Sequence, residues 1–565
     1  MPRGERQRLL WLIAPALLTL VLICRTFWYF FASLNNVPWS DLWPMLSEVR
    51  SFRSSQSGWG YLYSAFWGNR PLVPRLFIYL SARFLHYSGW SFVAITLAAQ
   101  LAMLLVVLYL IREAFPQRRT VYWLSTIVAV NLLLSSLQME VFMEGLNIEY
   151  TIGYGSAVAA IALSGLPWRP GPGSELRFWI ALLLGAVSSG CFTIGLAVFP
   201  MMMIAMWLAR GRASHMAITL AVAAVLAARF SIGYTRPALG MGIGGAIHRP
   251  LQALRIVALV LGGPVTLYSR SLGVAVGAVA ILTAATIFFR IAREPALRET
   301  PGAVSLTMIA WFMIASAASV MAGRLSPEWL AQTPYALPSR YLHPTLVFWA
   351  VLFPVSFLCL PRGLPGRITA FAMALIALTL AFGTWNWQWY LPREWAIVNE
   401  HLDAVASGFI LDVSDPVILD NVYPVPALRN EVVDYMRKQN LSVFDEPRSR
   451  WPGTNVMSIA PPDDRSTCRA VIRAIDPLDP GNTSGKAFRI TGSLVVDDRT
   501  PRRRLDVLMV DSTGIVKGLA RTLPIFSERA SAADFFGYLA GVSPRQIRIF
   551  ALSSGRAVRC VVSEP

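Results

Sequence analysis

The chain has 565 residues, of which 55% are hydrophobic and only 15% are charged. An ordinary soluble domain carries about 25% charged residues, so this composition excludes a chain that is soluble throughout. The formal net charge of +18 comes almost entirely from arginines in short clusters between apolar runs. That placement is typical of the loops of a membrane protein and argues against nucleic-acid binding.

About eleven apolar runs are candidates to cross a bilayer, whose hydrocarbon core of roughly 30 Å needs about 20 residues. The first run follows basic residues but continues without a small-residue cleavage site, so we expect a retained span and not a signal peptide. The runs lie near residues 9–32, 90–111, 120–137, 151–167, 177–193, 195–209, 214–233, 272–290, 303–322, 343–360 and 367–388.

Two stretches depart from simple spans. The runs 177–193 and 195–209 flank the polar, glycine-containing segment 188–195, so they are either two spans with a tight turn or two broken half-helices. Residues 251–267 are apolar but are interrupted by an arginine and by a Gly-Gly-Pro sequence. We expect this last stretch to be re-entrant or interfacial.

The arginines predict the orientation of the chain. With the N-terminus in the cytoplasm, five short loops become cytoplasmic and each of them is basic, as the positive-inside rule requires. The long segments 33–89, 138–150, 234–271 and 323–342, together with the C-terminal tail, then lie outside the cytoplasm. The loop arginines are Arg112, Arg118, Arg119, Arg169, Arg177, Arg210, Arg212, Arg290, Arg293, Arg298, Arg362 and Arg367.

The first outside segment, residues 33–89, contains three pieces rich in aromatic residues, near 39–44, 59–67 and 76–85. Trp and Tyr prefer the interface between membrane and water. We therefore expect short helices in this segment that lie along the outer leaflet.

From about Trp389 the chain has the composition of a soluble domain. Residues 391–450 alternate between strand-like and helix-like pieces, which predicts a membrane-proximal α/β segment. Residues 451–565 contain short alternating runs separated by turn residues, which predicts a small β-sandwich. The expected fold class is an α-helical polytopic membrane protein with a C-terminal extracytoplasmic α/β plus β-sandwich domain.

None of the five cysteines forms a C-x-x-C pair, so a zinc or redox motif has no support. Cys468 and Cys560 lie in the first and last predicted strands of the tail and are candidates for a disulfide; the alternative is two buried free thiols. A bond that closes about 90 residues could stabilise the domain by roughly 4 kcal/mol. It needs an oxidising compartment, which agrees with the predicted orientation.

The sequence contains no Walker loop, Rossmann glycine fingerprint, H-E-x-x-H or G-x-S-x-G motif, so soluble nucleotide chemistry is unsupported and no metal site is predicted. Asp41, just outside the first span, is a candidate general base toward an acceptor hydroxyl. Alternatively, Ser40 and Asp41 begin an interfacial helix, where an early carboxylate favours the helix dipole. Glu48 shares a face with Asp41 if the helix tolerates Pro44, and it is the weaker candidate.

Arg70 and Arg75 follow Asn69 in a proline-containing segment beside the membrane. Guanidinium groups bind phosphate oxygens bidentately, so both arginines are candidates to hold a phosphate or pyrophosphate. Either one alone could instead contact lipid head groups or a nearby carboxylate.

Glu140 and Glu144 are four residues apart and project together on a helix. Acidic residues between spans need water or a partner, so the pair predicts a site for a sugar, a cation or an arginine. The alternative is a structural ion pair with Arg70 or Arg75.

Arg340 lies at the outer mouth of the run 343–360 and suits a phosphate ligand. His343 could carry a proton, although a lone histidine at a helix start is more often structural. His248 adds a further polar group on the same predicted side.

At these positions the sequence resembles the GT-C class of polytopic glycosyltransferases, and within it a bacterial group. That group has V-P-x-x-D-x-W, N-x-H-R and F-P-R-L in its first outer loop, an acidic segment before span four, and S-R-Y before a late span. The resemblance covers roughly residues 1–390, but the His of N-x-H-R is absent and Leu42 stands where Gln or Glu is typical. The matching residues are Val37-Pro-Trp-Ser-Asp41-Leu-Trp43, Asn69-Arg70, Val73-Pro-Arg75-Leu76, Glu140 and Glu144, and Ser339-Arg340-Tyr341.

The resemblance implies a transferase of the bacterial inner membrane that moves a sugar from a polyprenyl-phosphate carrier to a cell-envelope glycan or lipid on the extracytoplasmic face. Asp41 would be the catalytic base, and the tail would resemble a carbohydrate-binding module. A lipid-phosphate leaving group would account for the missing nucleotide motif. The cofactor is left open, with a divalent cation as the candidate. The residues implied in carrier or substrate binding are Asn69, Arg70, Arg75, Glu140, Glu144, Arg340 and Tyr341.

Two other classes fit less well. Buried charge pairs across the middle spans would favour a non-catalytic glycolipid-binding, transport or polysaccharide-assembly protein, but the charge gathers at the outer rim. A polymerase or ligase of the O-antigen type usually has one large loop between late spans, whereas the long loops here are early. A surface glycosyltransferase is therefore the leading hypothesis.

Overall fold

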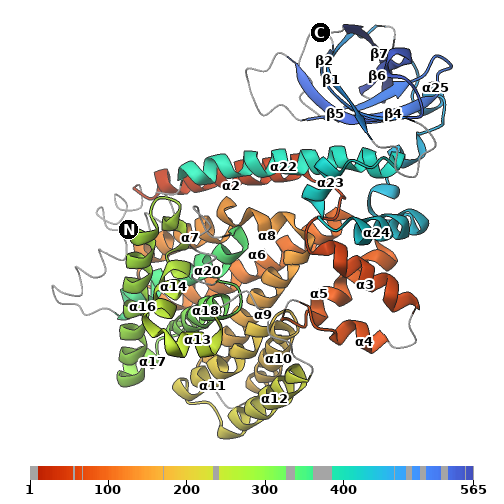
Figure 1. Ribbon diagram of the computed structural model, residues 1–565. Helices are drawn as coiled ribbons and strands as arrows, with labels where there is room; N and C mark the ends of the chain where they lie inside the picture. The colour runs from red at the N-terminus through yellow and green to blue at the C-terminus, as the bar shows by residue number, and fades with distance from the viewer. Residues whose placement is uncertain are drawn as a thin grey trace. The chain divides into compact units, whose positions relative to one another are not determined.

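The chain folds into two compact units (Figure 1). The membrane unit comprises residues 1–27, 57–76 and 93–392, and the barrel unit comprises residues 28–56, 77–92 and 393–565. The computed structural model describes residues 11–54, 58–66, 68–168, 171–232, 241–325, 338–359, 385–463, 465–478, 486–496, 504–523, 532–553 and 555–563.

The membrane unit is built of helices. Helices α2, α5, α6 and α22 (Trp385–Leu411) each run from one unit into the other. In chain order the helices before α22 that belong wholly or partly to this unit are α2 (Ile13–Ser33), α4 (Gly58–Tyr63), α5 (Leu72–Phe84), α6 (Gly89–Ala114), α7 (Arg119–Leu133), η1 (Ser136–Gln138), α8 (Met139–Met143), η2 (Gly145–Asn147), α9 (Ile148–Gly165), α10 (Pro172–Ser189), η3 (Thr193–Ala197), α11 (Val198–Leu208), α12 (Ala213–Ser231), α13 (Gly242–His248), α14 (Pro250–Leu261), α15 (Gly263–Thr266), α16 (Arg270–Arg293), α17 (Pro295–Arg298), α18 (Ala303–Gly323) and α20 (Ser339–Cys359).

Seven helical segments in the described part are long and apolar enough to cross a membrane, and each coincides with one of the predicted runs. Together with the C-terminal sheet domain, they agree with the expected class of an α-helical polytopic membrane protein that carries a C-terminal domain. The seven segments are Ile13–Ser33, Gly89–Ala114, Arg119–Met143, Ala213–Ser231, Arg270–Arg293, Ala303–Gly323 and Ser339–Leu358.

The other predicted runs have different outcomes. The runs 151–167 and 177–193 form α9 and α10, which fall outside this set of seven, and the run 195–209 is a shorter apolar segment, Thr193–Leu208. The run 367–388 lies outside the described residues up to 384. The interrupted stretch 251–267 forms α14 and α15, and α14 at about 18 Å is too short to cross a bilayer.

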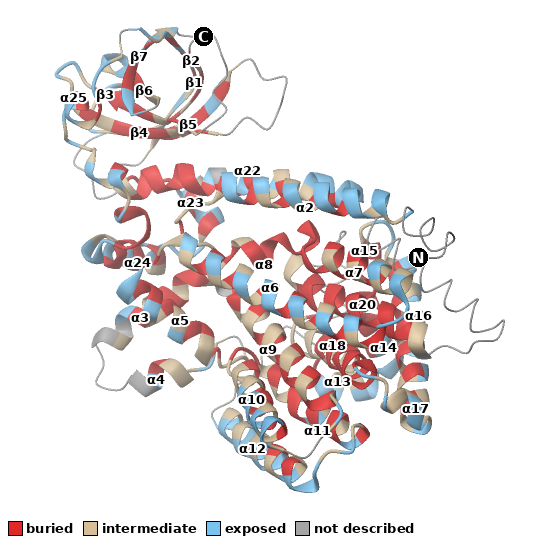
Figure 2. Cartoon of the chain, turned by 180° about the vertical axis from the view of Figure 1, so that it is seen from behind, coloured by how far each residue is buried: buried red, intermediate tan, exposed pale blue. Residues whose placement is uncertain are grey.

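The middle of the membrane unit is formed by α18 and α20. Within their apolar windows 72% and 89% of residues are buried, against 11% for α12 (Figure 2). Close packing elsewhere depends on small residues, because a Cβ added at Gly277 of α16 would lie 1.8 Å from the carbonyl oxygen of Ala258 in α14.

The barrel unit combines short helices with seven strands. The segment 391–450, expected to be α/β, contains helices joined by turns and no strand, so that expectation is wrong: residues 418–420 lie inside α23, and residues 442–444 form a 3₁₀ turn after the left-handed Asn440. Besides the ends of α2, α5, α6 and α22, its elements are α3 (Leu42–Ser54), α23 (Pro416–Val422), α24 (Pro426–Gln439), η5 (Ser442–Phe444), η6 (Pro447–Arg450), α25 (Val456–Ile459), β1 (Cys468–Leu478), β2 (Ala487–Val496), β3 (Asp506–Val510), β4 (Val516–Thr522), β5 (Ala533–Ala540), η7 (Pro544–Gln546), β6 (Arg548–Ser553) and β7 (Arg556–Ser563).

The seven strands form a closed barrel and not the expected sandwich. Their order is β1-β2-β5-β4-β3-β6-β7, and a parallel pairing of β1 with β7 closes the sheet. Both architectures require side chains that alternate between a core and the outside, so the alternation in the sequence could not distinguish them. The interior is filled with apolar side chains such as Ile490, Val507 and Phe535.

The predicted disulfide is present. Cys468 and Cys560 are bonded, with their Cα atoms 4.2 Å apart, and they are register partners in β1 and β7. The bond therefore joins the first and last strands where the barrel closes. Among the cysteines of the described part, Cys24 and Cys191 are free.

The first outside segment contributes α3 to the core of the barrel unit. Trp43 is fully buried, with ring centroids 5.6 Å from Phe409 of α22 and 6.4 Å from Tyr423. Leu42 and Leu46 are buried on the same helix. Of the helices expected along the outer leaflet, α3 thus has its apolar residues covered by protein.

A buried carboxylate joins the barrel to the helices of its unit. Asp403 of α22 accepts hydrogen bonds from Arg448 (2.6 Å) in η6, from Arg504 (3.0 Å) just before β3 and from Arg521 (2.7 Å) in β4. Arg504 also donates to the carbonyl of Leu34 at 3.4 Å, so the same cluster contacts the first outside segment.

Candidate functional site

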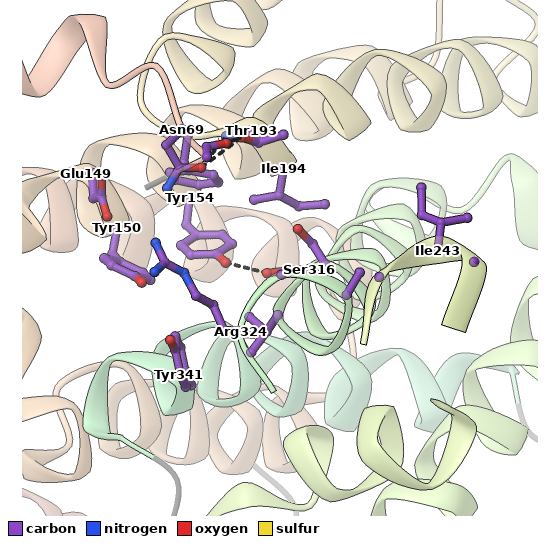
Figure 3. A pocket seen from close by; sticks show the side chains of 18 residues that line it. Asn69, Glu149, Tyr150, Tyr154, Thr193, Ile194, Ile243, Ser316, Arg324 and Tyr341 are labelled. Carbon is purple, nitrogen blue, oxygen red and sulfur yellow. Dashed lines mark hydrogen bonds between the residues drawn. The ribbon is translucent and has the colours of Figure 1, made fainter. Parts of the chain in front are cut away.

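A cavity of about 390 Å³ opens among the ends of several helices of the membrane unit (Figure 3). It lies at the N-terminal ends of α9 and α20 and the C-terminal end of α18. The arginine pattern predicts that these helix ends face the extracytoplasmic side. The lining residues are Gly68, Asn69, Glu149, Tyr150, Tyr154, Phe192, Thr193, Ile194, Gly242, Ile243, Gly244, Ser316, Ser319, Val320, Ala322, Gly323, Arg324 and Tyr341.

One wall of the cavity is the break between α10 and α11, which the structure resolves as two helices joined by η3. Asn69 holds this break: its Oδ1 accepts hydrogen bonds from the Thr193 hydroxyl (2.8 Å) and backbone N–H (3.2 Å). The Thr193 hydroxyl also lies 2.8 Å from the carbonyl oxygen of Gly68. The predicted residue Asn69 therefore lines the cavity and fixes its shape.

A second wall is aromatic. The ring of Phe192 lies 4.9 Å from that of Tyr154 and 6.3 Å from that of Tyr150. Glycine makes this packing feasible, because a Cβ at Gly153 would meet the Phe192 ring at 2.0 Å. The Tyr154 hydroxyl is hydrogen-bonded to Ser316 (Figure 3). Aromatic faces with polar edges suit a ligand that has both apolar and hydroxyl-bearing surfaces.

Among the described residues that line the cavity, two are charged, Glu149 and Arg324. In Figure 3 the guanidinium of Arg324 extends toward Tyr150 and Tyr154, while Glu149 lies beyond Tyr150. A guanidinium in a partly enclosed space is a strong ligand for phosphate oxygens. Neither residue is among those that the resemblance implied in carrier or substrate binding.

Arg340, predicted as a phosphate ligand, is paired with Glu140. Its guanidinium bonds the Glu140 carboxylate, whose Oε2 also accepts the backbone N–H of Arg340 at 3.1 Å. Glu140 thus caps the first turn of α20, a position that favours an anion. A structural ion pair was the alternative considered for the glutamates, and Glu140 forms one with Arg340. Glu144 is buried and accepts from Asn147 at 3.0 Å.

Arg70 and Arg75 do not line the cavity. Arg70 donates to the carbonyl of Phe230 at 3.1 Å and to that of Ile232, so it covers the C-terminal end of α12, where a cation is favoured. Arg75 is fully buried, donates to the carbonyl of Ser64 and lies 5.6 Å from the Tyr61 ring centroid. Their predicted role as phosphate ligands gains no support from these contacts.

The remaining candidate residues of the membrane unit have different positions relative to the cavity. Tyr341 lines the cavity. His343, two residues further into α20, is fully buried, with Nδ1 2.5 Å from the Gln138 side-chain oxygen and its ring 5.4 Å from that of Tyr154. This environment is the structural alternative considered for His343. His248 is exposed at the end of α13 and does not line the cavity.

Asp41 and Glu48 belong to the barrel unit. Asp41 follows Ser40, which has a left-handed φ of 55°, and immediately precedes α3, which carries Glu48. The segment before it is firmly held: the Asn36 side chain donates to Glu446 at 2.7 Å and accepts the Gly89 N–H at 2.8 Å. The role of Asp41 as a general base stays a prediction, as does that of Glu48.

A cation site is not evident in the described part of the chain. No group of three or more His, Cys, Asp or Glu side chains is arranged there to hold a metal ion. Among the residues that line the cavity, Glu149 is the single carboxylate.

Comparison with known proteins gives a distant structural similarity. No protein-family model and no curated protein matches the sequence. Among solved structures, the chain is similar to the archaeal oligosaccharyltransferase AglB from Archaeoglobus fulgidus, in complex with an inhibitory peptide and a dolichol-phosphate, with 16% sequence identity and a TM-score of 0.37. The match covers 75% of this chain and 61% of AglB, so the chain spans about three fifths of that protein.

Proposed function

We propose that the protein is a membrane glycosyltransferase that moves a sugar from a polyprenyl-phosphate carrier to a glycan or glycolipid acceptor on the extracytoplasmic face of a bacterial inner membrane. The observation that carries the proposal is the cavity of the membrane unit, where Arg324 meets a wall of Tyr150, Tyr154 and Phe192. A guanidinium for a phosphate and aromatic faces for a sugar ring are the two recognition elements such a donor needs. The motif resemblance of the first outer loop is independent support.

The reaction requires one proton acceptor and one stabilised leaving group. The acceptor hydroxyl oxygen forms a bond to the anomeric carbon while the bond from that carbon to the carrier phosphate oxygen breaks. The hydroxyl proton passes to a carboxylate, and the electron pair leaves with the polyprenyl phosphate. Arg324 would stabilise the negative charge on that phosphate.

Two carboxylates are candidates for the base. Asp41 is favoured by its motif, V-P-W-S-D, whereas Glu149 is favoured by its place in the cavity wall. Removing a general base lowers rates about 10²- to 10⁴-fold, so substitution of the true base should be nearly inactivating.

Glycan profiling in a deletion strain tests the proposal. The strain would carry the wild type or one of the variants Asp41→Asn, Glu149→Gln, Arg324→Gln and Arg118→Gln, and lipid-linked and surface glycans would be compared. Arg324→Gln should lower transfer about 100-fold, as loss of one charge-stabilising donor does in other enzymes. Arg118 is exposed and outside the cavity lining, so its variant should match the wild type.

The outcomes separate the parts of the proposal. If only one of the two carboxylate variants loses product, that residue is the base. If glycans remain identical in Arg324→Gln and in both carboxylate variants while the deletion strain differs, the protein acts without catalysing transfer and the proposed function is wrong.

A further inference from the structure

Several large apolar side chains of the barrel unit are exposed together at the ends of three helices. We define the interfacial patch as Trp28, Phe31, Leu80, Phe84, Leu85 and Trp90. Phe84, Trp28 and Trp90 have 69%, 58% and 54% of their surface exposed. Contiguous exposed apolar surface of this kind marks an interaction site, unlike single exposed hydrophobic residues.

The three helices of the patch are joined through α6, which contacts both α2 and α5. Phe31 of α2 stacks on Trp90 of α6 with ring centroids 5.7 Å apart. The buried face of α5 packs on the first turn of α6, with Ser81 and Ser91 hydroxyls 2.9 Å apart. Leu80 and Phe84, four residues apart on α5, are therefore directed away from that packed face.

Two features identify the partner as a phospholipid leaflet. Both α2 and α6 are candidate membrane spans, and the patch takes in the last turns of α2 and the first turn of α6, where a span meets the head groups. Tryptophan is enriched at that depth. In addition, residues 72–92 contain no Asp or Glu, and Arg83 is exposed in the last turn of α5, which favours an anionic lipid surface.

We propose that the interfacial patch inserts into the head-group region of a phospholipid leaflet, so that the end of α5, which is too short to span, lies in the membrane surface beside the two spans. The sequence predicted interfacial helices somewhere in residues 33–89, and this assignment selects α5 over the buried α3. The inference is independent of the proposed function.

Spin-label accessibility tests this assignment in the intact chain. Nitroxides would be attached at Phe84→Cys and, separately, at Leu85→Cys in a protein with Cys24→Ser and Cys359→Ser, reconstituted in nanodiscs of phosphatidylcholine and phosphatidylglycerol. The matched control is Val417→Cys on α23, which is also 69% exposed and lies in the same unit. Thermal unfolding would verify that all three labelled proteins are folded.

The expected result is a collision rate with oxygen that exceeds the rate with a water-soluble nickel chelate by several-fold at positions 84 and 85, with the reverse at 417. Two results would overturn the proposal. One is nickel accessibility at 84 and 85 equal to that at 417, which means the patch faces water. The other is exclusion of both reagents at 84 and 85, which means another protein surface covers it.

Discussion

The Glu140 carboxylate makes two interactions with Arg340. It accepts a hydrogen bond from the backbone N–H and forms an ion pair with the guanidinium. A Glu140→Gln variant keeps an acceptor but leaves the guanidinium without its counter-charge. We expect a loss of about 2 kcal/mol in unfolding free energy, the usual cost of leaving a buried polar group poorly satisfied. Thermal or denaturant unfolding in detergent would measure it.

The control for that variant is an exposed ion pair. Glu299 lies 3.6 Å from Arg210, and both side chains are more than two thirds exposed, so Glu299→Gln should change stability by less than about 1 kcal/mol. Equal stability of the two variants would contradict the role assigned to Glu140.

At the residue scale, the sequence predicted some of the polar residues that line the cavity, but it did not predict which residues form ion pairs with one another. Asn69 and Tyr341 were predicted and line the cavity, but the ion pair of Arg340 joins residues 200 positions apart, and no local pattern selects that partner. Arg324 was missed although a signal existed. The positive-inside rule makes an arginine at the outer end of a span exceptional.

At the element scale, the disulfide between Cys468 and Cys560 secures the short parallel pairing of β1 with β7, which extends over four residue pairs. The bond closes a loop of 92 residues, which is worth about 4 kcal/mol in the chain-entropy model. Reductant should therefore lower the unfolding temperature of the barrel in the wild-type chain. The Cys468→Ser/Cys560→Ser double variant should start lower and be insensitive to reductant. A wild type that unfolds at the same temperature with and without reductant would show that closure does not need the bond.

The elements themselves were largely accessible from the sequence. Seven of the predicted runs form helices that are long and apolar enough to cross a membrane, because an apolar run of sufficient length is a local property. The barrel was mistaken for a sandwich because the pairing of the two edge strands, β1 and β7, is decided by contacts between residues about 90 positions apart. The strand-like pieces of 391–450 became helical because the helix-starting Pro416 and the left-handed Asn440 set the local backbone.

At the scale of the whole molecule, Asp403 links three parts of the barrel unit through its arginines. Burial alone would raise its pKa, but the charges of Arg448, Arg521 and Arg504 outweigh that effect and hold the pKa well below the ordinary value. A carboxyl whose pKa is lower in the folded state contributes its full stability above the unfolded pKa of about 4 and loses it as the pH falls further.

The predicted consequence is a pH dependence specific to this carboxylate. The unfolding temperature of the barrel unit in the wild-type chain should hold between pH 8 and pH 5 and fall below about pH 4. Asp403→Asn should be less stable at neutral pH and decline less steeply in acid. Asp434→Asn, whose side chain is 59% exposed, is the control and should follow the wild type. Parallel acid profiles for wild type and Asp403→Asn would refute the assignment.

The sequence did not reveal which segments of the chain make up the barrel unit. Residues 28–56 and 77–92 fold together with residues 393–565, and the contacts responsible, such as Trp43 with Phe409, join positions more than 350 residues apart. The aromatic residues near 39–44 predicted a helix at the membrane surface, because Trp and Tyr are frequent at the membrane–water interface. Aromatic residues are equally suited to a buried contact within one unit, so the residue types could not distinguish the two cases.

The pairing of β1 with β7 sets an order of events during biosynthesis. Every other strand of the barrel precedes β7 in the chain, so the sheet stays open until β7 has been made. Until then, the apolar interior of the barrel has an unpaired edge available to chaperones or to misassociation. The bond between Cys468 and Cys560 can therefore form in its native register only after the last strand has been made.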